Sequence, residues 1–171
     1  MKALRIEHTS EFPVPSSELW SFHLRPEALA VLAPPLSGFA VVDRGQGVAD
    51  GSLLVAEVGW PPFRSRWQAL HLGVEQGRSF TDVALESPFP YWVHQHAVEP
   101  AGAGTSRLTD TVWFVPPSWL PVRLGGRLTA AVLRMFFAWR HRATRRWLAG
   151  RRQARRTGNR LCEFFAPGGC S

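Results

Sequence analysis

Short alternating runs of apolar and polar residues predict seven β-strands in this chain. Residues 3–13 place Leu4, Ile6 and Phe12 on one face and stop at Pro13, the pattern of a half-buried strand. Similar runs recur between Gly- and Pro-containing turns up to residue 116. The six strands predicted there are 38–43, 52–58, 64–74, 78–86, 92–98 and 106–115. Short links between consecutive strands favour an antiparallel meander.

Three helices complete the predicted fold. Ser16 or Ser17 caps a short helix over 18–23, and a second short helix spans 27–32. A long helix from Leu128 to Ala149 carries apolar residues at helical spacing. This stripe consists of Leu128, Val132, Met135, Phe136, Trp139 and Ala143. The element order predicts an α+β domain in which a curved, seven-stranded antiparallel sheet wraps around the long C-terminal helix.

The charge changes sign along the chain. Residues 1–122 carry 8 Lys and Arg against 12 Asp and Glu, whereas residues 123–171 carry 12 Arg and the single Glu163. We expect one domain over 1–149 and a basic, disordered tail over 150–171, where no periodicity persists. No nucleic-acid module accompanies the Arg residues, so we expect no nucleic-acid partner. A solvated helix end and a weak contact with anionic membranes through residues 140–160 both fit this charge.

Composition indicates a large apolar interior. The chain has 8 Trp and 11 Phe but a single Tyr, which is more aromatic surface than turns or a tail would use. Cys162 and Cys170 both lie near the C-terminus and fit neither a disulfide framework nor a four-ligand zinc site. Without a signal peptide or a membrane-spanning apolar run, we expect a cytoplasmic protein.

The strongest candidate chemistry lies on the last predicted hairpin. His94 and His96 share one face of their strand, and a hairpin centred near Gly102 would place His94 opposite Asp110 and His96 opposite Leu108. A carboxylate beside an imidazole fixes its tautomer and suits acid–base chemistry. A buried polar pair that only fixes strand register is an equally physical interpretation.

The His-x-His pair has a further interpretation as a metal site. With Asp82 or Asp110 in reach, two imidazoles and a carboxylate are a donor set that zinc and iron use. One uncertain carboxylate is weak support for it, so we predict no metal and no cofactor. The sequence contains no Gly-rich phosphate loop and no nucleophile elbow.

Four short motifs resemble those of a known superfamily. They are Phe80-Thr81-Asp82, Ser87-Pro88-Phe89, Trp92-x-His94-x-His96 and Thr105-x-x-Leu108-x-Asp110-x-Val112. Together with the element order over residues 4–147, they resemble the START-like, polyketide-cyclase/dehydrase superfamily called SRPBCC, which has a helix-grip fold. Ser87 stands where members often have Gly, and Phe114 where Tyr is common, which weakens any detailed functional inference.

The resemblance implies an internal cavity for a lipid, polyketide or other hydrophobic molecule, with catalysis in some branches only. We expect binding or carriage without catalysis. The alternatives are a cyclase or dehydratase that uses His94 and Asp110 as an acid–base pair, and a lipid-binding adaptor held to membranes by the Arg-rich end. The expected ligand contacts are Trp67, Phe80, Phe89, Trp92, His94, His96, Asp110, Val112, Phe114, Met135 and Trp139.

Overall fold

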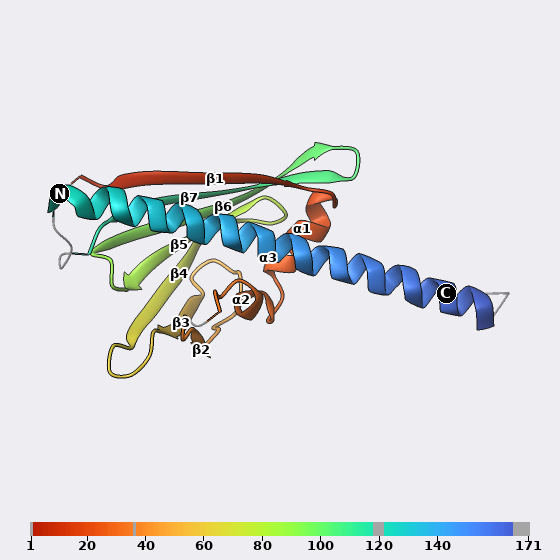
Figure 1. Cartoon of the computed structure of the whole chain (residues 1–171), viewed down its shortest axis with the longest axis horizontal. Coiled ribbons are helices and arrows are strands. Elements are labelled where there is room, and N and C mark those ends of the chain that lie inside the picture. The colour runs from red at the N-terminus through yellow and green to blue at the C-terminus, as the bar shows by residue number, and fades with distance from the viewer. Residues whose placement is uncertain (1, 36, 118–121, 166–171) are drawn as a thin grey trace.

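Seven strands and three helices follow one another in the predicted order within residues 2–35, 37–117 and 122–165, which the computed structural model describes (Figure 1). Side chains are described for the same residues except 122–124 and 155–165. The strands are β1 Leu4–Phe12, β2 Ala40–Asp43, β3 Leu53–Val58, β4 Ser65–Glu75, β5 Ser79–Glu86, β6 Tyr91–Gly102 and β7 Thr105–Val115. The helices are α1 Ser16–His23, α2 Ala28–Val31 and α3 Val122–Phe165.

All strands belong to one antiparallel sheet with the order β1-β7-β6-β5-β4-β3-β2. The sheet curves around α3, which runs along its inner face, while α1 and α2 close the side near the middle of that helix (Figure 1). This arrangement confirms the predicted helix-grip fold. Among the described residues, no helix is long and apolar enough to cross a membrane.

The predicted register of the last hairpin was wrong by two residues. His96 pairs with Asp110 and His94 with Val112, because β6 continues through Pro100 to Gly102 and a bulge there shifts the turn toward Gly104. An even shift leaves each side chain on its original face. The two histidines and Asp110 therefore still share the inner face.

The predicted inner face of α3 was also wrong, by about one residue or 100° of rotation. Leu128, Val132 and Met135 are exposed, Met135 by 67%. The buried positions repeat every three or four residues and are Thr129, Leu133, Phe137, His141, Thr144 and Leu148. A pattern of apolar residues alone misses this face because three of its six members are polar.

α3 does not end at Ala149 but continues to Phe165, so the expected disorder of the tail is wrong for residues 150–165. Residues 166–171 lie outside the described part of the chain. Arg145 donates to the Glu11 carbonyl at 2.7 Å, and Arg152 donates to the Pro13 carbonyl. These contacts tie α3 to the end of β1 and help to explain why the helix persists. Pro15, and not Ser16 or Ser17, occupies the N-cap of α1.

The apolar core consists of two clusters. One lies at the α1 end and includes Phe12, Phe22 and Leu108, and the other lies toward the opposite end and includes Trp92 and Phe114. The remaining members are Val14, Leu19, Trp20, Ala28, Leu32, Phe80, Val98 and Leu148 in the first, and Ile6, Val112, Leu133 and Phe137 in the second. On β6 and β7, the polar positions 94, 96 and 110 lie between the two clusters.

Candidate functional site

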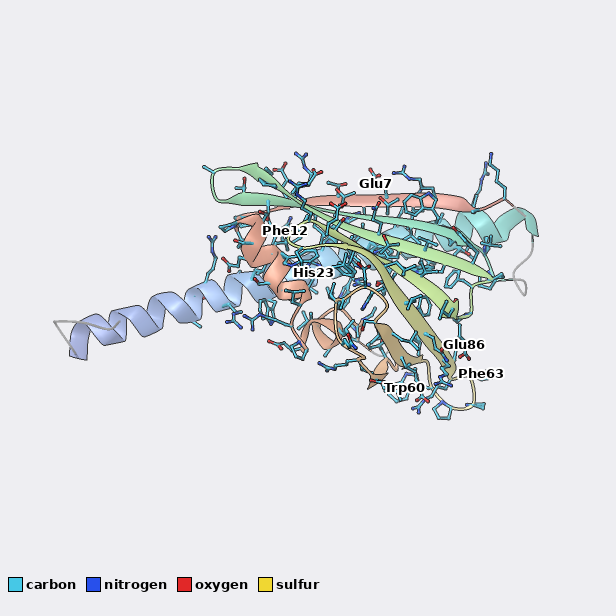
Figure 2. The ribbon with its side chains drawn as sticks, turned by 180° about the vertical axis from the view of Figure 1, so that it is seen from behind. Glu7, Phe12, His23, Trp60, Phe63 and Glu86 are labelled. Carbon is cyan, nitrogen blue, oxygen red and sulfur yellow. The ribbon has the colours of Figure 1, made fainter. Side chains whose placement is uncertain are left out.

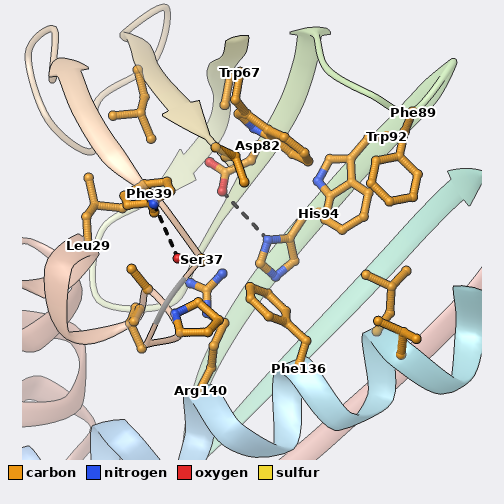
Figure 3. Close-up of a pocket in the computed structure, with 18 residues that line it drawn as sticks. Leu29, Ser37, Phe39, Trp67, Asp82, Phe89, Trp92, His94, Phe136 and Arg140 are labelled. Carbon is orange, nitrogen blue, oxygen red and sulfur yellow. Dashed lines mark hydrogen bonds and ion pairs between the residues drawn. The ribbon is translucent and has the colours of Figure 1, made fainter. Parts of the chain in front are cut away.

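A cavity of about 360 Å³ lies between the sheet, α3 and the segment that follows α2 (Figure 3). Most of its wall is apolar: Leu29, Leu32, Ala33, Pro34, Phe39, Leu54, Val58, Trp67, Ala69, Phe89, Trp92, Val132, Leu133 and Phe136. Its polar contacts come from Ser37, Asp82, His94 and Arg140. A mostly apolar wall with a few polar groups is typical of small-molecule sites.

Three aromatic side chains form one corner of this cavity. The ring centroids of Trp67 and Trp92 are 5.2 Å apart in an edge-to-face arrangement, and those of Phe89 and Trp92 are 4.9 Å apart. Aromatic rings supply large apolar contact area at low cost in conformational entropy. This corner is the part of the wall best suited to an apolar ligand.

The structure divides the residues expected to contact ligand into three groups. Trp67, Phe89, Trp92 and His94 line the cavity. Phe80, His96, Asp110, Val112 and Phe114 are buried without lining it. Met135 and Trp139 do not line it either, since α3 contributes Val132, Leu133, Phe136 and Arg140 instead. The rotation of α3 described above is the reason.

Asp110 is the centre of a buried polar cluster. Its Oδ1 lies 3.2 Å from His94 Nε2 and 2.7 Å from His96 Nδ1, while its Oδ2 lies 2.9 Å from His141 Nε2. The side chains of all four residues are at most 3% exposed. A buried carboxylate needs such partners, because each missing one would cost free energy of folding.

A second carboxylate, Asp82 on β5, lies on the other side of the same two imidazoles. Asp82 is the direct cross-strand partner of both His94 and His71. Its Oδ2 lies 3.4 Å from His96 Nε2 and 3.7 Å from His94 Nδ1, and its Oδ1 lies 3.0 Å from His71 Nε2. His94 and His96 are therefore held between two carboxylates.

All six histidines of the chain take part in this region. The ring of His8 packs on that of His141 at 4.5 Å between centroids, and His23 packs on His96 at 5.7 Å. Figure 2 shows His23 in the interior, where α1 meets the sheet and α3. We refer to His8, His23, His71, His94, His96 and His141, with Asp82 and Asp110, as the His/Asp cluster.

Burial and charge shift the pKa values of this cluster in different directions. Burial alone would lower the pKa of His96, but the charge of Asp110 and hydrogen bonds to both carboxylates raise it to about 9. Burial alone would raise the pKa of Asp110, yet the charge of His96 and its imidazole hydrogen bonds hold it well below its usual range. At neutral pH, His96 is thus an imidazolium between two carboxylates.

The neighbouring imidazoles shift in different directions. Burial and the charge of His96 lower the pKa of His94 to about 4, and the same two causes lower that of His23 to about 3. For His71, burial would lower the pKa, but the hydrogen bond to Asp82 and its charge raise it. His94, the imidazole that lines the cavity, is neutral at pH 7.

Arg140 brings a cation to the cavity wall. Its guanidinium lies 5.5 and 5.6 Å from the ring centroids of Phe136 and Phe137, and its buried Nε has no hydrogen-bond partner. Burial lowers the pKa of Arg140, and the charges of Asp110 and Asp82 offset only part of this shift. In Figure 3 the side chain extends from α3 toward the cavity. An anionic group of a ligand would find hydrogen-bond donors here.

Sequence reasoning missed five residues of this region: His8, His23, His71, His141 and Arg140. Asp82 was considered only as a metal ligand. Asp82 belongs to the Phe80-Thr81-Asp82 motif, on the strand before the His-x-His strand. Because neighbouring strands of a meander pair directly, this position was a usable signal that Asp82 lies beside the two histidines.

Residues 54–148 match the protein family described as "Domain of unknown function (DUF8410)". The chain belongs to this family. The match begins in β3 and ends within α3, so it includes the cavity wall from Leu54 onward and every member of the His/Asp cluster except His8 and His23. No curated protein matches the chain.

Solved structures with the same fold include START-superfamily proteins and enzymes. The Zhui aromatase/cyclase from Streptomyces sp. R1128 is 16% identical with a TM-score of 0.66, over 98% of this chain and 99% of that one. A START superfamily protein from Mycobacterium smegmatis is 14% identical with a TM-score of 0.64, over 84% and 98%. These similarities establish the START/SRPBCC fold for this chain.

A third similarity is to part of a larger enzyme. The nucleoside-diphosphate sugar epimerase from Corynebacterium glutamicum is 26% identical with a TM-score of 0.66, over 84% of this chain. The chain spans 29% of the length of that epimerase.

Proposed function

We propose that this DUF8410 protein binds a small hydrophobic or amphipathic molecule in its internal cavity and acts as a carrier or receptor for it. The observation that carries this proposal is the wall composition: an aromatic and aliphatic surface with polar contacts from Ser37, Asp82, His94 and Arg140. Apolar contacts would supply affinity, and the polar groups would orient the ligand. The START-superfamily fold supports the same class of ligand.

Native mass spectrometry after gentle purification tests the proposal directly, through the mass of a co-purifying molecule. Binding of the fluorescent probe 1-anilinonaphthalene-8-sulfonate provides a quantitative assay. Val132→Trp should fill part of the cavity from α3 and weaken probe binding about tenfold or more. Leu128→Trp is the matched control, because Leu128 is similarly exposed one turn away and does not line the cavity. Equal probe affinity in both variants would contradict the proposal.

A second candidate function is catalysis of a cyclase or dehydratase type. The observation that favours it is that His94 lines the cavity and that its Nε2 lies 3.2 Å from Asp110 Oδ1. This is the arrangement that orients a general base. Turnover of a poly-β-keto substrate should be lost in His94→Ala and reduced in Asp110→Asn, with probe binding retained. Unchanged turnover in both variants would exclude the acid–base pair.

A further inference from the structure

The hydrogen bonds of Asp110 determine which ring nitrogens of His94 and His96 remain for other partners. A carboxylate only accepts hydrogen bonds, so a neutral imidazole that contacts Asp110 presents an N–H to it. His94 uses Nε2 and His96 uses Nδ1 for this contact, at 3.2 and 2.7 Å. The other ring nitrogens, His94 Nδ1 and His96 Nε2, face Asp82. A neutral ring presents a lone pair there, whereas the His96 imidazolium presents an N–H that a metal ion would have to displace.

Both of these nitrogens lie close to the same carboxylate oxygen. Asp82 Oδ2 lies 3.7 Å from His94 Nδ1 and 3.4 Å from His96 Nε2. His71 repeats the pattern, because its Nδ1 contacts the Gly47 carbonyl at 2.9 Å and its Nε2 lies 3.0 Å from Asp82 Oδ1. Nitrogens of three imidazoles thus meet one carboxylate, an arrangement that requires protons between them, as on the His96 imidazolium, or a metal cation in their place.

We propose that Asp82, His94 and His96 form a binding site for a divalent transition-metal ion such as zinc or iron(II), on the polar wall of the cavity. One ligand atom from each residue lies within 4.8 Å of the others. Metal–ligand bonds of about 2.0–2.1 Å in a tetrahedron separate ligand atoms by about 3.3 Å, close to the 3.4 and 3.7 Å seen here.

The surroundings fit a metal ion in two further ways. Asp110 contacts His94 Nε2 and His96 Nδ1, the ring nitrogens on the side away from Asp82. In metal sites, a carboxylate in this position fixes the orientation of the histidine ligands. The two carboxylates, Asp82 and Asp110, together offset the charge of a divalent ion. A binding site with two His and one carboxylate also leaves coordination positions free.

The free coordination positions of such an ion would be open to the ligand of the cavity. Asp82 and His94 line it, whereas His96 lies behind them, so an ion held there would face the cavity on its open side. Arg140 adds a positive charge to the same wall. An oxygen anion, such as a carboxylate or enolate, would then complete the coordination. This part of the inference rests on the proposed ligand binding, whereas the metal site itself does not.

Metal titration of the tag-free chain, after removal of bound ions with a chelator, tests the site. We expect one Zn²⁺ or Co²⁺ per chain by calorimetry, and a visible Co²⁺ spectrum typical of nitrogen and oxygen ligands at low coordination number. Asp82→Asn and His96→Gln should each weaken binding by more than the roughly 10–100-fold that loss of an outer partner costs. His8→Gln is the control, because the His8 ring packs on His141 and not on the proposed ligands Asp82, His94 and His96.

The cobalt spectrum of the unmodified chain keeps the test decisive even where a variant does not fold. Absence of stoichiometric binding by the unmodified chain would overturn the proposal, and so would equal affinities in His8→Gln and a folded Asp82→Asn. Val132→Trp separates this site from the proposed function. It should lose the fluorescent probe and keep the metal, whereas failure of the metal site would leave probe binding intact.

Discussion

His96 and Asp110 are direct cross-strand partners, and His96 Nδ1 lies 2.7 Å from Asp110 Oδ1. The contact connects the two long strands of the sheet at the point where α3 adds His141 to the same carboxylate. One side chain thus joins β6, β7 and α3. We therefore expect the stability of the domain to depend on the Asp110 side chain.

Asp110→Ala should lower the free energy of unfolding by about 3–5 kcal/mol, because it leaves a buried imidazolium without its main partner. Urea unfolding followed by tryptophan fluorescence measures this loss. Glu11→Gln is a suitable control, since the exposed ion pair of Glu11 with Arg107 should contribute less than about 1 kcal/mol. Similar losses in the two variants would show that Asp110 does not stabilise the domain as argued.

The orientation of α3 gives a second prediction. Leu133→Ala should destabilise the fold by about 2–5 kcal/mol, because Leu133 is buried. Met135→Ala should change stability by less than about 0.5 kcal/mol, because Met135 is exposed. Chemical unfolding of the two variants decides between this orientation and the one in which Met135 faces the cavity. The reverse order of effects would favour the latter.

Stability should fall as the pH decreases below 6.5. The pKa of His23 is about 3 in the folded chain against 6.5 for the ordinary group. Between these values the unfolded chain binds a proton that the folded chain does not, so each such histidine removes up to about 1.4 kcal/mol per pH unit. The contribution is absent above pH 6.5.

His23→Phe should make this acid-side decline shallower, by one proton in the pH dependence of the unfolding free energy. The comparison should be made in the presence of a chelator, so that metal binding does not contribute. His94, with a pKa lowered to about 4, adds to the decline in both proteins. Slopes that are identical with and without His23 would contradict the assignment of a neutral, buried imidazole.

Arg140 should select among amphipathic ligands by charge. Arg140→Met should weaken binding of 1-anilinonaphthalene-8-sulfonate about tenfold, because the sulfonate loses a charge-assisted donor. Binding of the uncharged probe N-phenyl-1-naphthylamine should change little. Fluorescence titrations of both probes give the comparison. An equal loss for the two probes would mean that Arg140 contributes shape and not charge.

The Arg-rich end of α3 allows a test of the membrane alternative. Arg145 and Arg152 are engaged with carbonyl groups at the end of β1, whereas the segment beyond 152 adds Arg155, Arg156 and Arg160 to the sequence. We expect a chain ending at residue 152 to lose salt-sensitive sedimentation with phosphatidylserine vesicles and to keep probe binding. Sedimentation that is unchanged by the truncation would remove that segment as a membrane anchor.

Much of the fold follows from short-range patterns. Alternation along residues 4–12 and 105–115, and turns rich in Gly and Pro, are local properties, so the order of the elements along the chain could be predicted. The shared face of His94, His96 and Asp110 was predictable for the same reason, because any even register preserves it. The exact pairs were not, since they depend on a bulge at Pro100 and Gly102.

The contribution of α3 to the site could not be predicted from hydrophobicity. His141 is buried against Asp110, and that contact joins residues far apart in the chain. A helix face with polar members has no distinctive local signature. The rotation of α3, and with it the identity of Arg140 as a cavity residue, therefore depends on tertiary contacts.

The division of the core into two apolar clusters has a consequence for how this domain can change. Trp67, Phe89, Trp92, Leu133 and Phe136 line the cavity and pack in or against one cluster, whereas Phe12, Phe22 and Leu108 belong to the other. Between the two clusters, β6 and β7 pair as antiparallel strands and carry His94, His96 and Asp110 of the His/Asp cluster. Val58 and Val132 line the cavity but belong to neither cluster, whereas Leu32 and Leu133 line it as cluster members. Substitutions at Val58 and Val132 can therefore reshape the cavity with little loss of core packing, so ligand preference can diverge there without a matching loss of stability.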